Sequence, residues 1–116
     1  MNIIFKQHLN DEYARYTVLD LDTFELADGT QHTACCVIEN TPIHELSVLP
    51  SLRLLHENLI KNLALKNWDF CEQAIEQLMG KWGGEVDTFY QDLLARVQDL
   101  KAQTLPDDWS PVIPKS

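Results

Sequence analysis

The sequence lacks the residue patterns that identify zinc-binding, membrane or secreted proteins. Its three cysteines, Cys35, Cys36 and Cys71, form no CxxC pair and no Cys–His spacing, which argues against a zinc site. Their odd number, with two of them adjacent, argues against a disulfide framework and favours a reducing compartment. No apolar run approaches membrane-spanning length, and the N-terminus lacks the apolar core of a signal peptide. We therefore expect a cytoplasmic protein that does not bind membranes.

Basic residues are also scarce. Nine lysines and arginines stand against 18 aspartates and glutamates, so the formal net charge is -9. An acidic surface repels the phosphate backbone of nucleic acids and attracts basic surfaces or cations. We therefore expect no nucleic-acid partner.

Catalytic and cofactor motifs are missing as well. The four histidines are His8, His32, His44 and His56, and they include no His-x-x-x-His pair. The segment 80–84 lacks the spacing and the Lys-Ser/Thr ending of a phosphate-binding loop. Residues three apart on a strand face opposite sides, so His32 and Cys35 do not form a nucleophilic pair. The sequence predicts no catalytic residue, no metal site and no cofactor, and it favours a non-enzymatic protein.

The first third of the sequence predicts a β-hairpin. Residues 13–26 are rich in aromatic and β-branched side chains, and they alternate apolar with polar positions around Leu19 and Leu21. Asp28-Gly29 is typical of a tight hairpin turn, and the returning strand covers residues 30–39. The short apolar run at residues 3–5 is typical of an edge strand.

Two hairpin registers are compatible with this pattern. A two-residue loop at Asp28-Gly29 places Leu21 opposite Cys36 and gathers more apolar side chains on one face, so we prefer it. A three-residue loop that begins at Ala27, with a bulge, places Leu21 opposite Cys35 instead.

Three apolar stripes at helical spacing follow, with a short helical turn expected at Ile43 to Leu46. Pro50 suits the first turn of the first helix, Asp69 and Glu72 have capping-box spacing for the second, and Gly83-Gly84 is expected to end it. Short connections favour antiparallel neighbours. The stripes are Leu52, Leu55, Leu59, Ile60 and Leu63; Cys71, Ala74, Ile75, Leu78, Met79 and Trp82; and Val86, Phe89, Tyr90, Leu93, Val97 and Leu100.

The predicted fold is α+β: a small antiparallel sheet, followed by three antiparallel helices packed on one face. Residues 1–104 form a single domain, with a β part at 1–42 and a helical part at 43–104. Residues 105–116 form a proline-rich arm that cannot be helical. Its Trp109, Val112 and Ile113 leave open whether it docks on its own domain or on a neighbouring subunit.

The hairpin from Leu55 to Leu78 resembles a single tetratricopeptide-type helix pair. A tight turn carries Trp68, and a small residue, Cys71, follows in the second helix. The first helix lacks the aromatic and glycine pattern of that family, and no second repeat follows. The resemblance therefore implies a packed helix pair and assigns no family.

Two groups of side chains are candidates for binding. Bulky aromatics at helix ends and in the arm, Trp68, Phe70, Trp82 and Trp109, are candidates for an interaction surface, although they equally suit the ends of a core. Asp20 and Asp22 lie two apart on one strand face and could hold a divalent cation, or they could form a solvated polar face.

The favoured function is a non-enzymatic protein-protein interaction or regulatory module, which binds through the helical hairpin or a sheet edge. Homodimerisation is plausible because a short sheet has edges to cover. The alternative is a small-ligand or cation-binding protein, with a pocket between sheet and helices lined by Tyr13, Tyr16, Trp68 and Tyr90. An enzyme that uses Asp20, Asp22 and a histidine with a metal is less favoured.

Overall fold

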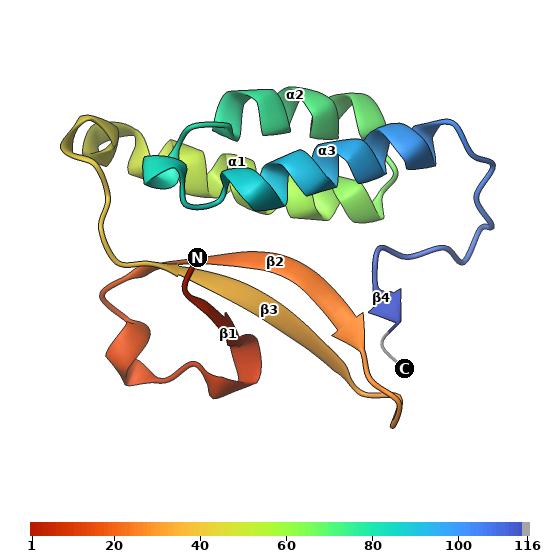
Figure 1. Cartoon of the computed structure of the whole chain (residues 1–116), viewed down its shortest axis with the longest axis horizontal. Coiled ribbons are helices and arrows are strands. Elements are labelled where there is room, and N and C mark those ends of the chain that lie inside the picture. The colour runs from red at the N-terminus through yellow and green to blue at the C-terminus, as the bar shows by residue number, and fades with distance from the viewer. Residues whose placement is uncertain (115–116) are drawn as a thin grey trace. The chain divides into compact units, whose positions relative to one another are not determined.

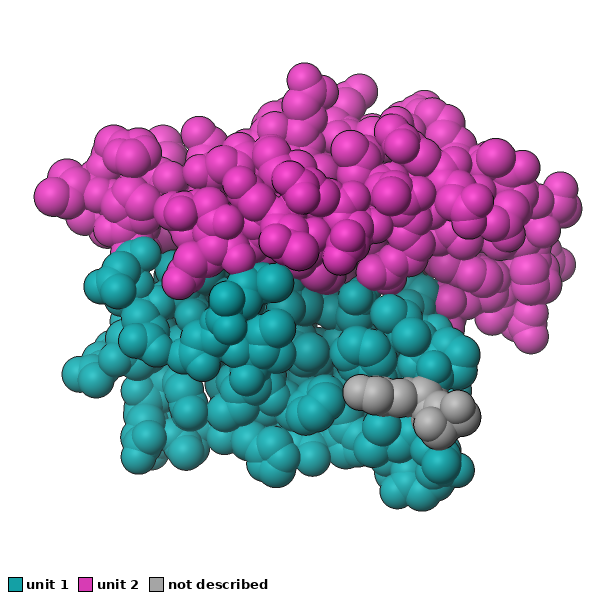
Figure 2. Space-filling model, in the orientation of Figure 1, with its two compact units in different colours: residues 1–40, 111–116 teal, residues 41–110 magenta. Residues whose placement is uncertain are grey.

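The computed structural model describes residues 1–114, and these form an α+β protein with a four-stranded sheet and three helices (Figure 1). The chain divides into two compact units (Figure 2). One unit comprises Met1–Asn40 with the segment from Pro111 onward, and we call it the sheet unit. The other comprises Thr41–Ser110, and we call it the helical unit. The packing of helices on one sheet face stays a prediction.

The sheet unit contains β1 (Ile3–Phe5), β2 (Thr17–Glu25), β3 (Gln31–Ile38) and β4 (Ile113–Pro114), in the order β1-β3-β2-β4. The expected edge strand at residues 3–5 is confirmed, because β1 pairs antiparallel with β3. The prediction of a purely antiparallel sheet is wrong, because β4 pairs parallel with β2. This pairing places Ile113 opposite Phe24, and the long connection that parallel strands need is supplied here by β3 and the whole helical unit.

The preferred hairpin register is also wrong. Next to the turn, Glu25 lies opposite Gln31, and the amide of Gly29 donates to the carbonyl of Leu26 at 2.9 Å, which is the three-residue loop. Gly29 has a φ of 85°, a left-handed conformation that glycine adopts without strain. A register shift between Asp20 and Thr23 then brings Leu19 opposite Cys36. The bulge reconciles this turn with an apolar face on which Leu19 and Leu21 are both buried.

The helical unit begins with a 3-10 segment, η3 (Ile43–Val48), which confirms the expected helical turn there. Its helices are α1 (Leu49–Ala64), α2 (Trp68–Leu78) and α3 (Asp87–Lys101), and α2 packs against both α1 and α3. Pro50 lies in the first turn of α1 as expected. The apolar stripes form the core of this unit: Leu52, Leu59, Leu63, Cys71, Ala74, Ile75, Leu78, Val86, Phe89, Tyr90, Leu93 and Val97 are all buried.

A tight turn joins α1 to α2. The amide of Asn67 donates to the carbonyl of Asn62 at 3.0 Å, and that of Lys66 donates to Leu63 at 3.2 Å. These two bonds form a Schellman motif, in which Lys66 occupies the left-handed position with a φ of 63°. The motif satisfies the last carbonyls of α1 and turns the chain directly into α2.

Two sequence expectations about α2 are wrong. The helix ends at Leu78, before Gly80, and Gly83-Gly84 instead forms a left-handed turn with Trp82, whose φ is 59°. The capping box is not formed either, since no side chain caps the N-terminus of α2. Lys101 of α3 attracts both carboxylates: its Nζ lies 2.6 Å from Asp69 and 2.9 Å from Glu72. A full positive charge competes better for these carboxylates than a backbone amide does.

Candidate functional site

Buried polar side chains occupy the centre of the helical unit. The indole Nε1 of Trp82 donates to the hydroxyl oxygen of Tyr90 at 2.9 Å, and the same hydroxyl lies 2.8 Å from Nδ1 of His56. Tyr90 and Trp82 are fully buried, and His56 is only 1% exposed. A buried polar group without a partner is costly, so these bonds fix how the left-handed turn, α1 and α3 fit together.

A second buried contact ties η3 to the left-handed turn. Oε1 of Glu45 accepts the backbone amide of Trp82 at 2.9 Å, although Glu45 is only 3% exposed. A bulky residue with positive φ is strained, and the surrounding contacts must hold it in place. The hydrogen bond to Glu45 from the amide of Trp82, together with the bond from its indole, provides two such contacts.

Because Glu45 points inward, η3 shows apolar side chains to solvent. Ile43 is 87% exposed, Leu46 53% and Val48 45%. This reverses the usual arrangement, in which the acid is solvated and the aliphatic side chains are buried. We call Ile43, Leu46 and Val48 the η3 apolar patch.

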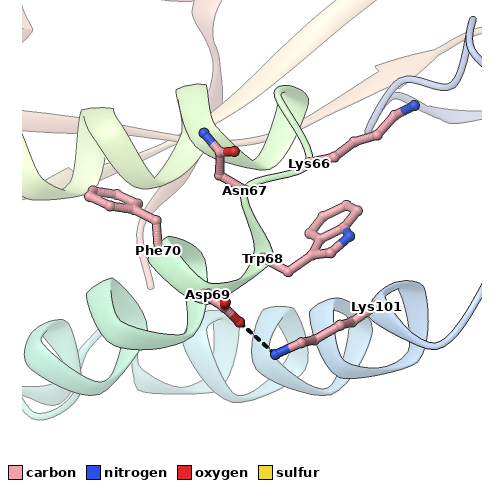
Figure 3. Close-up of a pocket in the computed structure, with 6 residues that line it drawn as sticks. All are labelled: Lys66, Asn67, Trp68, Asp69, Phe70 and Lys101. Atoms are coloured by element: carbon pink, nitrogen blue, oxygen red, sulfur yellow. Dashed lines mark hydrogen bonds and ion pairs between the residues drawn. The ribbon is translucent and has the colours of Figure 1, made fainter.

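Three of the four predicted interaction residues lie around the turn between α1 and α2. Trp68 and Phe70 line an open hollow of about 430 Å³, together with Lys66, Asn67, Asp69 and Lys101 (Figure 3). Trp68 and Phe70 point in different directions from the start of α2, so they do not form one aromatic cage (Figure 3). The hydrogen bonds of Lys101 to Asp69 and then to Glu72 raise its pKa, so the ammonium in this hollow is firmly charged and already paired.

The C-terminal arm supplies the third residue, Trp109. Its ring packs edge-to-face on Trp68 with centroids 5.6 Å apart, and Nζ of Lys66 donates to the carbonyl of Pro106 at 3.2 Å. The arm therefore docks on its own chain, first at this turn and then through the pairing of β4 with β2. Residues 115–116 of the predicted arm lie outside the described residues.

The fourth predicted residue, Trp82, does not belong to a surface. It is fully buried, with its indole and amide both hydrogen-bonded inside the helical unit. The structure assigns it to the core, which was the alternative for a tryptophan at a helix end.

The candidate cation ligands lie at the irregular part of β2. Oδ2 of Asp20 forms an ion pair with Nζ of Lys6 at 3.1 Å, and its Oδ1 accepts from Sγ of Cys35 at 3.4 Å. Asp20 and Asp22 are both half-buried beside the register shift in β2, and their joint binding of a cation stays a prediction. Among residues 1–114, no three His, Cys, Asp or Glu side chains gather closely enough to hold a metal ion.

The cysteines are free and buried. Burial and the adjacent Asp20 raise the pKa of Cys35 to about 12, and burial raises that of Cys71 to about 11. Because the thiolate is the nucleophile, these two side chains are unreactive at neutral pH.

The expected ligand pocket would need Tyr90 as a lining residue. Tyr90 is fully buried, and its hydroxyl bonds to Trp82 and His56, so its polar end is already occupied. Trp68 is likewise packed against Trp109. Both residues therefore have structural partners within the helical unit.

A second concave surface lies between α2 and α3. This groove of about 510 Å³ is lined by Glu72, Ile75, Glu76, Met79, Leu94 and Gln98. The sequence showed the buried side of these helices but not this groove, because Met79 was assigned to the core stripe. Met79 and Leu94 are half-buried, which is typical of positions that border a groove.

Comparison with protein-family models, curated proteins and solved structures finds no match to this chain. None of the described helices is both long enough and apolar enough to cross a membrane. The argument for a function therefore depends on the chemistry of the surfaces described above.

Proposed function

We propose that this chain is a non-enzymatic interaction module that binds another protein through its helical unit. The observation that supports this most directly is the η3 apolar patch. Exposing three large aliphatic side chains in six residues is unfavourable unless a partner covers them. The hydrogen bond from the Trp82 amide to the buried Glu45 supports the arrangement in which they are exposed.

The partner that best fits this patch is an uncharged, apolar surface of a different protein. Within η3 the exposed ionisable side chain is His44, since Glu45 is buried. A second copy would bring together two chains of net charge -9, which repel each other. We therefore favour a heterologous partner, with homodimerisation as the competing outcome. The proposal includes a cytoplasmic setting, which three free, buried cysteines support.

Site-specific crosslinking tests this proposal. A photoreactive residue replaces Leu46, and a control chain carries it at the exposed Gln91 on α3. We expect a discrete adduct with another protein from position 46, and loss of that adduct when Ile43→Asp is added. An adduct of twice the chain's own mass would show self-association instead. Equal adducts from both positions, or none from position 46, would show that η3 is not a binding surface.

A further inference from the structure

The groove between α2 and α3 follows one face of α2. One wall is formed by Glu72, Ile75 and Glu76 of α2 and by Met79 directly after it, in the i, i+3, i+4, i+7 spacing of one helix face. Its α3 wall contributes Leu94 and Gln98, four residues apart. The seven steps from Glu72 to Met79 extend about 10 Å, which matches about two turns of a partner helix.

The chemistry of the groove is apolar at its floor and acidic along one edge. The half-buried Met79 and Leu94 supply thioether and aliphatic surface above the fully buried Ile75, and methionine adapts readily to different partners. The helix α2 carries three carboxylates, at Asp69, Glu72 and Glu76, and no basic residue. Lys101 pairs with the first two of these, whereas Glu76 is exposed one turn further along the groove.

We propose that this groove binds a basic amphipathic helix. The apolar side chains of that helix would lie on Met79 and Leu94, and a lysine or arginine would pair with Glu76. Helices docked in grooves use this division between apolar anchors and flanking charges. The acidic surface of the chain would also accelerate the approach of a basic partner. This inference goes beyond the η3 surface, because it assigns a second and independent partner surface to the same helical unit.

Methionine labelling provides a direct test. The chain has two methionines, Met1 and Met79, and only Met79 lines the groove. The probe is a synthetic amphipathic helix of leucine and lysine, about 14 residues or four turns long. With methyl-labelled methionine, we expect this peptide to shift the Met79 signal while the Met1 signal stays in place. A matched peptide with glutamate in place of lysine should shift neither.

A pair of charge reversals tests the acidic edge. In fluorescence anisotropy with the leucine–lysine peptide, we expect Glu76→Lys to weaken binding about five- to tenfold, the effect of about 1 kcal/mol or slightly more. The matched control is Glu57→Lys, an exposed acid on α1, which should change binding less than twofold. Circular dichroism checks that both variants fold.

Three results would overturn the inference: no Met79 shift with the leucine–lysine peptide, equal shifts at Met1 and Met79, or equal losses from both charge reversals. The last two results would show that the peptide binds through the net charge of the chain and not in the groove. Crosslinking from Leu46 does not involve this groove, so the η3 surface can succeed where the groove fails, and the reverse also holds.

Discussion

The indole of Trp82 donates to the hydroxyl of Tyr90 at 2.9 Å, and this hydroxyl lies 2.8 Å from Nδ1 of His56. The bonds join residues from the left-handed turn, α3 and α1. In the described part of the chain, no buried side-chain nitrogen or oxygen lacks a hydrogen-bond partner. Removing the hydroxyl would create unsatisfied groups at the centre of the helical unit.

Tyr90→Phe should therefore lower the free energy of unfolding by about 1–3 kcal/mol, the usual cost of leaving a buried polar group without its partner. Urea unfolding followed by tryptophan fluorescence suits this measurement, because Trp68, Trp82 and Trp109 all lie in the helical unit. Tyr13→Phe, in the sheet unit, is the control and should leave this transition within about 0.5 kcal/mol of the parent. A Tyr90→Phe chain as stable as the parent would show that the hydroxyl does not stabilise the core.

The hydrogen bond between Glu45 and the Trp82 amide leads us to expect different losses of stability from two substitutions of Glu45. Glu45→Ala removes the acceptor of the Trp82 amide and should destabilise the helical unit by about 1.5–3 kcal/mol, as for hydrogen bonds to charged groups. Glu45→Gln keeps an oxygen in the same place and should cost less. Hydrogen exchange at the Trp82 amide should follow the same order. Equal exchange in both variants would mean that the carboxylate does not hold this turn.

The cysteine thiols should not react in the folded protein. With pKa values of about 12 for Cys35 and about 11 for Cys71, the thiolate fractions at pH 8 are roughly one in ten thousand and one in a thousand. Ellman's reagent should therefore react with none of the three buried cysteines within minutes in native buffer, and with all three in denaturant. A thiol that reacts rapidly in the native protein would contradict the burial of the cysteines and would make a nucleophilic cysteine a candidate.

The arm should be released when its aromatic contact is removed. Trp109→Ala deletes the edge-to-face packing on Trp68, which contributes about 0.5–1.5 kcal/mol beyond the buried area. We expect protection from hydrogen exchange at residue 109, whose amide donates to the carbonyl of Pro106 at 3.1 Å, to fall by up to about tenfold. The neighbouring exposed residue gives the control, Asp108→Ala, which should not change this protection. Unchanged exchange in Trp109→Ala would show that the stacking does not hold the arm.

The turn between α1 and α2 contains backbone strain that a substitution can relieve. Lys66 holds the left-handed position of the Schellman motif at a φ of 63°, where glycine is preferred. Lys66→Gly should therefore stabilise the helical unit by about 0.5–1 kcal/mol, despite the loss of an exposed hydrogen bond to Pro106. Thermal unfolding measures this effect, with Lys61→Gly inside α1 as a variant expected to destabilise by a similar amount. A drop in melting temperature for Lys66→Gly would show that the lysine side chain outweighs the strain.

Local periodicity was sufficient to predict much of the fold. Leu59, Ile75 and Leu93, one from each predicted stripe, lie in α1, α2 and α3 and are fully buried, and the hairpin turns at Asp28-Gly29 as expected. These features depend on residues a few positions apart, whose spacing alone determines which side chains share a face. For the candidate site, the sequence singled out Trp68, Phe70 and Trp109 by size and position, and the structure brings Trp68 and Trp109 into contact.

Interactions between residues distant in sequence became visible only in the tertiary structure. Glu45 looks like an ordinary surface acid until its partner, the Trp82 amide 37 residues away, is known. Asp69 and Glu72 have the spacing of a capping box, yet both form ion pairs with Lys101 of α3 instead. The parallel β4, the bulge in β2 and the inward turn of Trp82 likewise depend on groups distant in sequence. The sequence by itself determined that there is an edge strand, a hairpin and three helices, because their spacing patterns are local properties. The tertiary structure decided which polar groups are buried and which apolar side chains stay exposed. The reason is that a buried polar group needs a hydrogen-bond partner, and here the partners come from distant segments.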